Sequence, residues 1–311
     1  MAKIAIVQQA PVFLDKQKSI LKAVELVEKT AKQGAKLVVF TEAFIPGYPA
    51  WVWRLRPGSD MGLSAELHSR LLKNAVDLDS DDLQPLYGAA KKHQITIVCG
   101  IHERDNELTR STLYNCVITI SDKGELINRH RKLMPTNPER MVWGFGDASG
   151  LRVIDTPVGR IGSLICWENF MPLARYALYA QGVEIYIAPT YDSGDNWMGS
   201  LQHIAREGGC WVLGSCNLIN ESDLPQYFPE KESLYPEKNG WINGGGSAVI
   251  APDGKIVAGP MINESGILYY DIDLEKAANA KRAFDVAGHY SRPDIFNLEV
   301  NNKPQSSISF K

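Results

Sequence analysis

Short runs of apolar residues recur along the whole chain and alternate with polar and turn-forming segments. Most of these runs hold four to eight residues and are rich in Val and Ile, which is typical of strands buried on at least one face. The pattern predicts strands over residues 4–8, 37–41, 95–100, 113–120, 126–131, 153–155, 161–165, 185–188, 211–215, 247–251 and 267–273.

Helical periodicity fills several intervals between these strands. Over residues 15–33, apolar side chains recur at i, i+3 and i+4, as in a helix that buries one face. Residues 80–93 begin with Ser and Asp, which favour a helix N-terminus. Residues 172–181 and 200–208 are two further predicted helices.

Three segments have the composition of hairpin turns, namely residues 121–124, 252–254 and 263–266. Hairpins within a strand–helix alternation exclude a purely parallel, doubly wound sheet. The fold class that follows is mixed α/β, with buried sheets lying between layers of helices.

The chain of 311 residues shows neither an internal repeat nor a low-complexity linker. We therefore expect a single domain over residues 1–311. A polar segment at 220–243, rich in Pro, Glu and Lys, is interpreted as an insertion that forms a loop on this domain. A short C-terminal tail follows residue 294.

Composition excludes several classes of function. Thirty-three basic and 36 acidic residues give a formal charge of −3, which offers no basic excess to attract a nucleic acid. Apolar stretches are far shorter than the roughly 20 residues that span a bilayer, and the N-terminus resembles a first strand rather than a signal peptide. We expect a cytoplasmic protein with no nucleic-acid or membrane partner. The five cysteines, none in a Cys-x-x-Cys pair, fit a reducing compartment: Cys99, Cys116, Cys166, Cys210 and Cys216.

Cys166 stands at a predicted strand-to-helix turn. The strand pattern of residues 159–165 precedes it, and Pro172 is well suited to the first turn of the following helix. Such a turn exposes a side chain at the sheet edge and aims backbone N–H groups at it, which favours a thiolate. The alternative is a buried core cysteine that ends a strand.

Three charged residues stand beside predicted strands. Glu42 ends the apolar run 37–41, where burial would raise its pKa and suit it to general-base work, unless it is simply salt-bridged. Lys132 closes the strand 126–131, and alternation places His130 on the same face. Glu139 follows in a Pro-rich loop. For the last three residues, a solvated edge strand and a surface ion pair are the alternatives.

Five longer motifs resemble those of the nitrilases. They are Thr-Glu-Ala-Phe-Ile-Pro-Gly-Tyr-Pro (41–49), His-Arg-Lys-Leu-Met-Pro-Thr (130–136), Glu-Arg-Met-Val-Trp-Gly-Phe-Gly-Asp (139–147), Cys-Trp-Glu-Asn-Phe-Met-Pro-Leu (166–173) and Gly-His-Tyr-Ser-Arg-Pro-Asp (288–294). The motifs stand in the family's order and cover nearly the whole chain. The resemblance implies a four-layer α-β-β-α sandwich and a Glu–Lys–Cys catalytic triad with no cofactor and no metal.

Carried over residue by residue, the resemblance assigns four catalytic positions. Cys166 is the nucleophile, Glu42 the general base and Lys132 the cationic stabiliser, while Glu139 supports them. The backbone N–H of Trp167 is expected to hold charge on the intermediate, and Cys-Trp-Glu is the nitrilase form of this motif. Aromatic residues near the motifs, together with His130, are the substrate-binding candidates: Trp167, Tyr48, His130, Trp143 and Tyr191.

The function that the resemblance implies is hydrolysis of an organic nitrile to a carboxylic acid and ammonia, through a Cys thioimidate and thioester. An aromatic-lined pocket would favour aryl or arylaliphatic nitriles. A cyanide hydratase or dihydratase and an amidase of the same superfamily are alternatives. An inactive, filament-forming interaction protein is an alternative of another class. Nitrile and water are the expected partners, with assembly into a homodimer or a larger spiral or filament, although the short tail leaves its size open.

Overall fold

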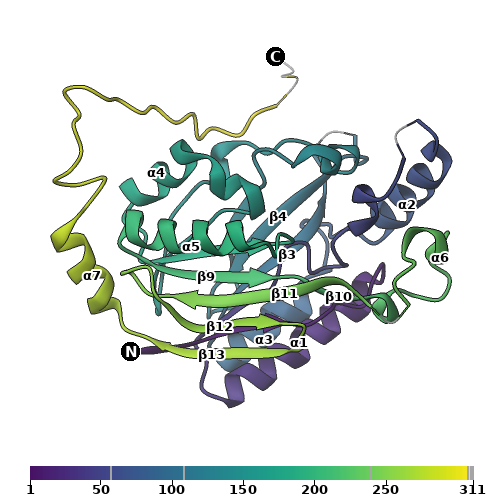
Figure 1. The fold of residues 1–311 in the computed structure, drawn as a ribbon, viewed down its shortest axis with the longest axis horizontal. Helices are drawn as coiled ribbons and strands as arrows, with labels where there is room; N and C mark the ends of the chain where they lie inside the picture. Colours follow the sequence, from purple (N-terminus) through teal and green to yellow (C-terminus); the bar gives the residue numbers. More distant parts are fainter. Residues whose placement is uncertain (57, 108, 239, 307, 309–311) are drawn as a thin grey trace.

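The computed structural model describes residues 1–56, 58–107, 109–238, 240–306 and 308, and two β-sheets form its centre (Figure 1). The first sheet has six strands in the order β13-β1-β2-β3-β4-β5. β1 pairs in parallel with β2 and β2 with β3, whereas the other neighbours are antiparallel. The strand bounds are β1 (Ala2–Gln8), β2 (Leu37–Val39), β3 (Thr96–Arg104), β4 (Leu113–Ile120), β5 (Leu126–Arg131) and β13 (Gly266–Ile272).

The second sheet has seven strands in the order β10-β11-β9-β8-β7-β6, with β12 paired to β11. β7, β8 and β9 are parallel to one another. The strand bounds are β6 (Ile154–Thr156), β7 (Gly159–Ser163), β8 (Ile185–Thr190), β9 (Trp211–Cys216), β10 (Leu218–Asn220), β11 (Trp241–Ile250) and β12 (Ile256–Ile262).

Helices cover the outer face of each sheet. α1 (Lys16–Lys32) and α3 (Gln84–His93) bury Ile20, Val27, Leu86 and other apolar residues against the first sheet. α4 (Pro172–Ala180) and α5 (Asp195–Gly208) cover the second sheet on the opposite side of the molecule (Figure 1).

The inner faces of the two sheets form a third core between them. Its members come from both sheets, as Ile6 and Val98 do from the first and Ile187 and Leu213 from the second. Three cores separate four layers, so the predicted α-β-β-α sandwich is confirmed.

The remaining elements lie at the margins of the sandwich. α2 (Met61–Lys73) and α6 (Lys231–Leu234) lie at one end, and α7 (Leu274–Ala283) leads into the C-terminal segment that passes α4 (Figure 1). Short 3₁₀ turns complete the chain: η1 (Ala50–Trp53), η2 (Asn137–Met141), η3 (Ala148–Gly150), η4 (Cys166–Phe170) and η5 (Glu221–Asp223). The described helices include none that is long and apolar enough to cross a membrane.

The hairpin predicted at residues 263–266 is wrong. β12 pairs with β11 in the second sheet, whereas β13 pairs with β1 in the first, so this turn carries the chain from one sheet to the other. The side chain of Gln8 secures the crossing, because its amide nitrogen donates to the carbonyls of Met261 and Glu264 at 2.9 and 2.8 Å.

Candidate active site

Glu42 lies in the loop that follows β2, and its carboxylate is completely buried. The loop passes so close to Gly100 of β3 that a Cβ atom there would overlap the backbone of Thr41 and Ala43. A glycine in the neighbouring strand is therefore what allows this loop to enter the interior.

Three donors hold the Glu42 carboxylate in one orientation. Asn115 Nδ2 and Lys132 Nζ donate to Oε1 at 2.7 and 3.0 Å, and the Tyr191 amide donates to Oε2 at 2.7 Å. Burial raises the pKa of Glu42 above its usual value, and the charge of Lys132 opposes that shift. The result is a fixed, desolvated carboxylate with an increased affinity for a proton.

Lys132 follows directly after β5 and is buried between two carboxylates. Its ammonium group lies 3.0 Å from Glu42 Oε1 and 2.7 Å from Glu139 Oε2. Burial alone would lower the pKa of Lys132, but Glu42, Cys166 and Glu139 together raise it above its usual value. Lys132 therefore keeps a positive charge inside the protein.

Glu139 connects Lys132 to the backbone of the turn η2. Its Oε2 accepts from the Thr136 amide at 2.6 Å, completing a capping box, and its Oε1 accepts from the Tyr48 hydroxyl at 2.7 Å. The same carboxylate therefore caps the turn and fixes the ammonium group of Lys132.

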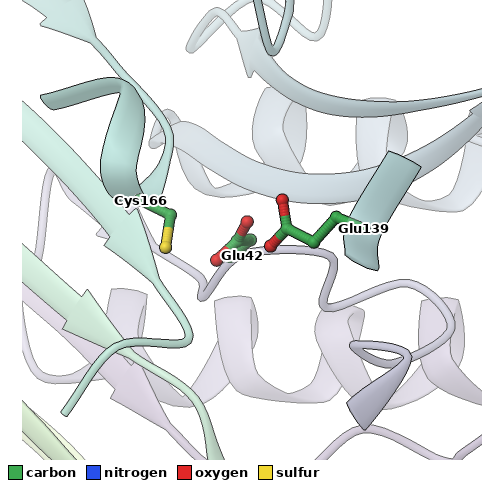
Figure 2. Close-up of side chains that lie close together, drawn as sticks. All are labelled: Glu42, Glu139 and Cys166. Atoms are coloured by element: carbon green, nitrogen blue, oxygen red, sulfur yellow. The ribbon is translucent and has the colours of Figure 1, made fainter. Parts of the chain in front are cut away.

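Cys166 begins the turn η4 after β7, with its backbone in the left-handed region at φ +53°. Its sulfur accepts a hydrogen bond of 3.2 Å from the hydroxyl of Thr190, which ends β8. Figure 2 shows Cys166, Glu42 and Glu139 converging from separate segments of the chain. The thiol and one oxygen of each carboxylate lie within 4.8 Å of one another.

The surroundings of Cys166 oppose the loss of its thiol proton. Burial, reinforced by the charge of Glu42, raises the pKa of Cys166 to about 12 against the opposing effect of Lys132. The thiolate that the turn was expected to favour is opposed by desolvation and by the two carboxylates, which together raise the pKa of Cys166 against the ammonium group of Lys132. A thiol with this raised pKa gives up its proton only to a base, and a carboxylate oxygen of Glu42 lies within 4.8 Å of the sulfur.

Glu42, Glu139 and Cys166 could offer ligand atoms to a metal ion, because the thiol sulfur and one oxygen of each carboxylate lie close together. However, the ammonium group of Lys132 already forms ion pairs with both carboxylates. A metal cation at this point would be repelled by that charge, so the residues present do not fit a metal.

His130 and Glu168 form a buried pair behind the catalytic candidates. His130 Nε2 lies 3.0 Å from both carboxylate oxygens of Glu168. Glu168 also accepts from the amides of Leu133 and Ile165 at 2.8 and 2.7 Å. Glu168 thereby ties the turn carrying Cys166 to the segment carrying Lys132, a role that the sequence motif alone did not reveal.

A cavity of about 300 Å³ opens onto Cys166 and Glu139. Tyr48 and Tyr191 stack at 4.0 Å between ring centroids in its wall, and Trp53 donates to the Tyr48 hydroxyl at 2.9 Å. The full lining is Tyr48, Trp53, Thr136, Glu139, Cys166, Trp167, Tyr191, Asp192, Ser193, Gly194, Ile242 and Asn243.

The five substrate-binding candidates divide into two groups. Tyr48, Tyr191 and Trp167 line the cavity, and Trp167 is 42% exposed. Trp143 and His130 are buried outside this lining. The indole of Trp143 packs edge-on against Tyr48 and donates to His102 Nδ1 at 3.0 Å, while His130 is engaged by Glu168. Both therefore support residues that line the cavity or carry the catalytic candidates.

A comparison with known protein families shows which class of enzyme has this fold and this buried cluster. The chain matches the carbon-nitrogen hydrolase family over residues 3–282. The chain therefore belongs to the carbon-nitrogen hydrolases.

Its relatives place it among the nitrilases of that family. It is 40% identical to nitrilase 3 of Arabidopsis thaliana, over 99% of this chain and 89% of that protein. It is 41% identical to a bifunctional nitrilase/nitrile hydratase of Nicotiana tabacum, over 98% and 87% of the two chains. The crystal structure of Saccharomyces cerevisiae Nit3, a member of the nitrilase superfamily, shares the fold with a TM-score of 0.73 at 23% identity, covering 93% of this chain and 96% of that one. The chain is thus a hydrolase that acts on carbon–nitrogen bonds.

Proposed function

We propose that this enzyme hydrolyses an organic nitrile to the carboxylic acid and ammonia, and that Cys166 carries the acyl group. The observation that supports this most directly is the buried cluster of Glu42, Lys132 and Glu139 beside the Cys166 thiol at the floor of a cavity. It offers a nucleophile, a base and a fixed positive charge in one place.

In the first step, Glu42 takes the thiol proton while Cys166 Sγ attacks the nitrile carbon. One carbon–nitrogen π bond breaks, and the nitrogen becomes negative before it receives that proton, giving a neutral thioimidate. Lys132 and the backbone N–H of Trp167, within the first turn of η4, stabilise the charge on nitrogen.

Two molecules of water complete the reaction. Glu42 takes a proton from the first water, which adds to the thioimidate carbon, and ammonia leaves to give a thioester. The second water adds in the same way and releases the carboxylic acid and the thiol. If the sulfur leaves before ammonia does, the product is an amide. We expect some amide as a by-product, because the relative from Nicotiana tabacum is named a bifunctional nitrilase/nitrile hydratase.

The substrate class we propose is aryl or arylaliphatic nitriles. Tyr48, Tyr191, Trp53 and Trp167 supply aromatic surface to the cavity, which suits a flat apolar substrate.

Ammonia release from a panel of compounds tests the reaction and its substrate together. The panel holds phenylacetonitrile, benzonitrile, a dinitrile, cyanide and the matching amides, each read against a protein-free blank. We expect ammonia from the aromatic nitriles. Ammonia from the amides alone would make the enzyme an amidase, and ammonia from cyanide alone a one-carbon enzyme. If no compound of the panel yields ammonia, the protein is an inactive scaffold rather than an enzyme.

The pH dependence of turnover is expected to report the ionisation of Glu42. A protonated Glu42 cannot accept the thiol proton, so kcat/KM should fall as the pH drops through its pKa. Burial raises this pKa above the usual 4.5, so the acid limb should lie above that of an ordinary carboxyl group. In Glu42→Gln we expect kcat/KM to fall by at least about 10²-fold, and its pH profile to have no acid limb.

A pH profile of kcat/KM for the wild-type enzyme, Glu42→Gln and a control variant, Glu275→Gln, checks this expectation. Glu275→Gln, at an exposed position of α7, removes a carboxylate that does not line the cavity and should keep the wild-type profile. If Glu42→Gln retains both the acid limb and activity within tenfold of wild type, the base is another group.

We further propose that copies assemble into a homodimer or a larger homo-oligomer in the cytoplasm. Exposed apolar side chains on α4 and the C-terminal segment, among them Leu173, Ile295 and Phe296, support an assembly surface. The five free, buried cysteines support a reducing compartment. Light scattering after size-exclusion chromatography is expected to give a multiple of the chain mass, and the mass of a single chain would contradict assembly.

A further inference from the structure

Asp192 lies in the wall of the cavity, close to the nucleophile. It comes two residues after the end of β8, and its backbone amide donates to the Thr190 hydroxyl at 2.8 Å. The same hydroxyl donates to Cys166 Sγ at 3.2 Å, so one side-chain oxygen connects Asp192 to the sulfur. The sequence motifs gave no reason to single out this residue.

Two neutral donors fix the Asp192 carboxylate. The indole nitrogen of Trp167 donates to Oδ2 at 2.7 Å, and the Gly194 amide donates to Oδ1 at 2.9 Å. Neither donor carries a charge of its own, so neither contact cancels the charge of the carboxylate. Trp167 and Gly194 also line the cavity, so the carboxylate is held at the surface that a substrate meets.

The described residues that line the cavity supply no positive charge to offset Asp192. Among the described residues, its lining contains no Lys, Arg or His, and Asp192 forms none of the ion pairs. The charge of Lys132 is already shared between Glu42 and Glu139. The cavity therefore carries an excess of negative charge.

We propose that Asp192 makes this cavity select by charge, admitting neutral and cationic nitriles and rejecting nitriles that carry a carboxylate. The inference rests on the proposed nitrile hydrolysis for its substrate class. Like charges repel strongly in a partly desolvated space, where the effective dielectric constant is well below that of water. The same repulsion acts on the acid product, which is an anion, and favours its release.

A series of nitriles of nearly equal size tests the proposal. The compounds are 4-methylphenylacetonitrile, 4-(aminomethyl)phenylacetonitrile and 4-(cyanomethyl)benzoate, which are neutral, cationic and anionic at pH 7. We expect kcat/KM of the wild-type enzyme for the anion to be at least about tenfold below that for the neutral compound. Asp192→Asn should narrow this gap about tenfold and weaken any preference for the cation.

Asp195→Asn is the matched control, because it removes the same charge at an exposed position that does not line the cavity. It should keep the wild-type ratios. A gap that Asp192→Asn leaves unchanged, or that Asp195→Asn narrows equally, would overturn the proposal.

A second measurement does not depend on nitrile hydrolysis. Iodoacetate and iodoacetamide differ in charge and alkylate the same thiol, so the ratio of their rates at Cys166, followed by mass spectrometry, reports the field in the cavity. The rate with iodoacetate is divided by the rate with iodoacetamide, both for Cys166 and for 2-mercaptoethanol. For wild-type protein this ratio should be at least about tenfold lower than for 2-mercaptoethanol, and Asp192→Asn should raise it part of the way back. If no nitrile is hydrolysed but the ratio behaves in this way, the proposed function fails and the charge selection stands. A wild-type ratio equal to that of the free thiol would overturn the charge selection itself, whether or not the variant folds.

Discussion

Replacing Cys166 by alanine is expected to reduce nitrile turnover by at least about 10³-fold while leaving the fold intact. The variant loses the atom that would bond to the nitrile carbon, and neither Glu42 nor Lys132 can replace it. The structural cost is small, because the thiol takes part in one described hydrogen bond, from the Thr190 hydroxyl. Alanine also tolerates the left-handed backbone no worse than cysteine does, since both carry a Cβ.

Ammonia release and thermal unfolding of the same preparations test this expectation. Cys210→Ala is the matched control, because Cys210 is also buried and free but does not line the cavity. It should unfold at a somewhat lower temperature and remain active. Turnover by Cys166→Ala above a trace would remove the covalent mechanism, and loss of activity in both variants would point to a general effect on folding.

Local patterns in the sequence predicted where the catalytic candidates stand along the chain. Each of Glu42, Lys132 and Cys166 follows a strand whose apolar or alternating sequence pattern predicts it, namely β2, β5 and β7. The ends of these strands meet where the two sheets face each other, so residues far apart in sequence become neighbours in one buried cluster.

Partners that depend on packing between segments could not be predicted in the same way. The Tyr191 amide reaches Glu42 only because β8 of one sheet packs against the loop after β2 of the other. Glu168 reaches His130 across the same interface between sheets. Nothing in the residues around either position encodes such a contact, because it depends on how the sheets are stacked.

The missed helices have a different explanation. The prediction relied on a continuous apolar face, and α2 buries Leu67 and Leu71 while α7 buries Ala277. A helix at the margin of the sandwich covers little of the core, so few of its apolar positions are buried. The second predicted helix also begins later than expected, at Gln84 rather than residue 80, because the acidic residues before it form turns.

Replacing Lys132 by methionine is expected to lower both stability and activity. Methionine fills a similar volume, but it leaves the carboxylates of Glu42 and Glu139 buried without the ammonium group that lies 3.0 and 2.7 Å from them. Removing one partner of a buried ion pair costs about 3 to 5 kcal/mol in the free energy of unfolding. Losing the positive charge at the developing anion should reduce kcat/KM by at least about 10²-fold.

The double variant Lys132→Met/Glu139→Gln separates the two effects. Neutralising Glu139 leaves Glu42 as the one carboxylate of the pair that is buried without its cation, so urea unfolding should show part of the lost stability restored. Activity should stay low, because the charge on the nitrile nitrogen still lacks its cation. If the double variant regains activity together with stability, Lys132 acts by holding the cluster together rather than by stabilising the anion. Activity within tenfold of wild type in the single variant would remove Lys132 from the mechanism altogether.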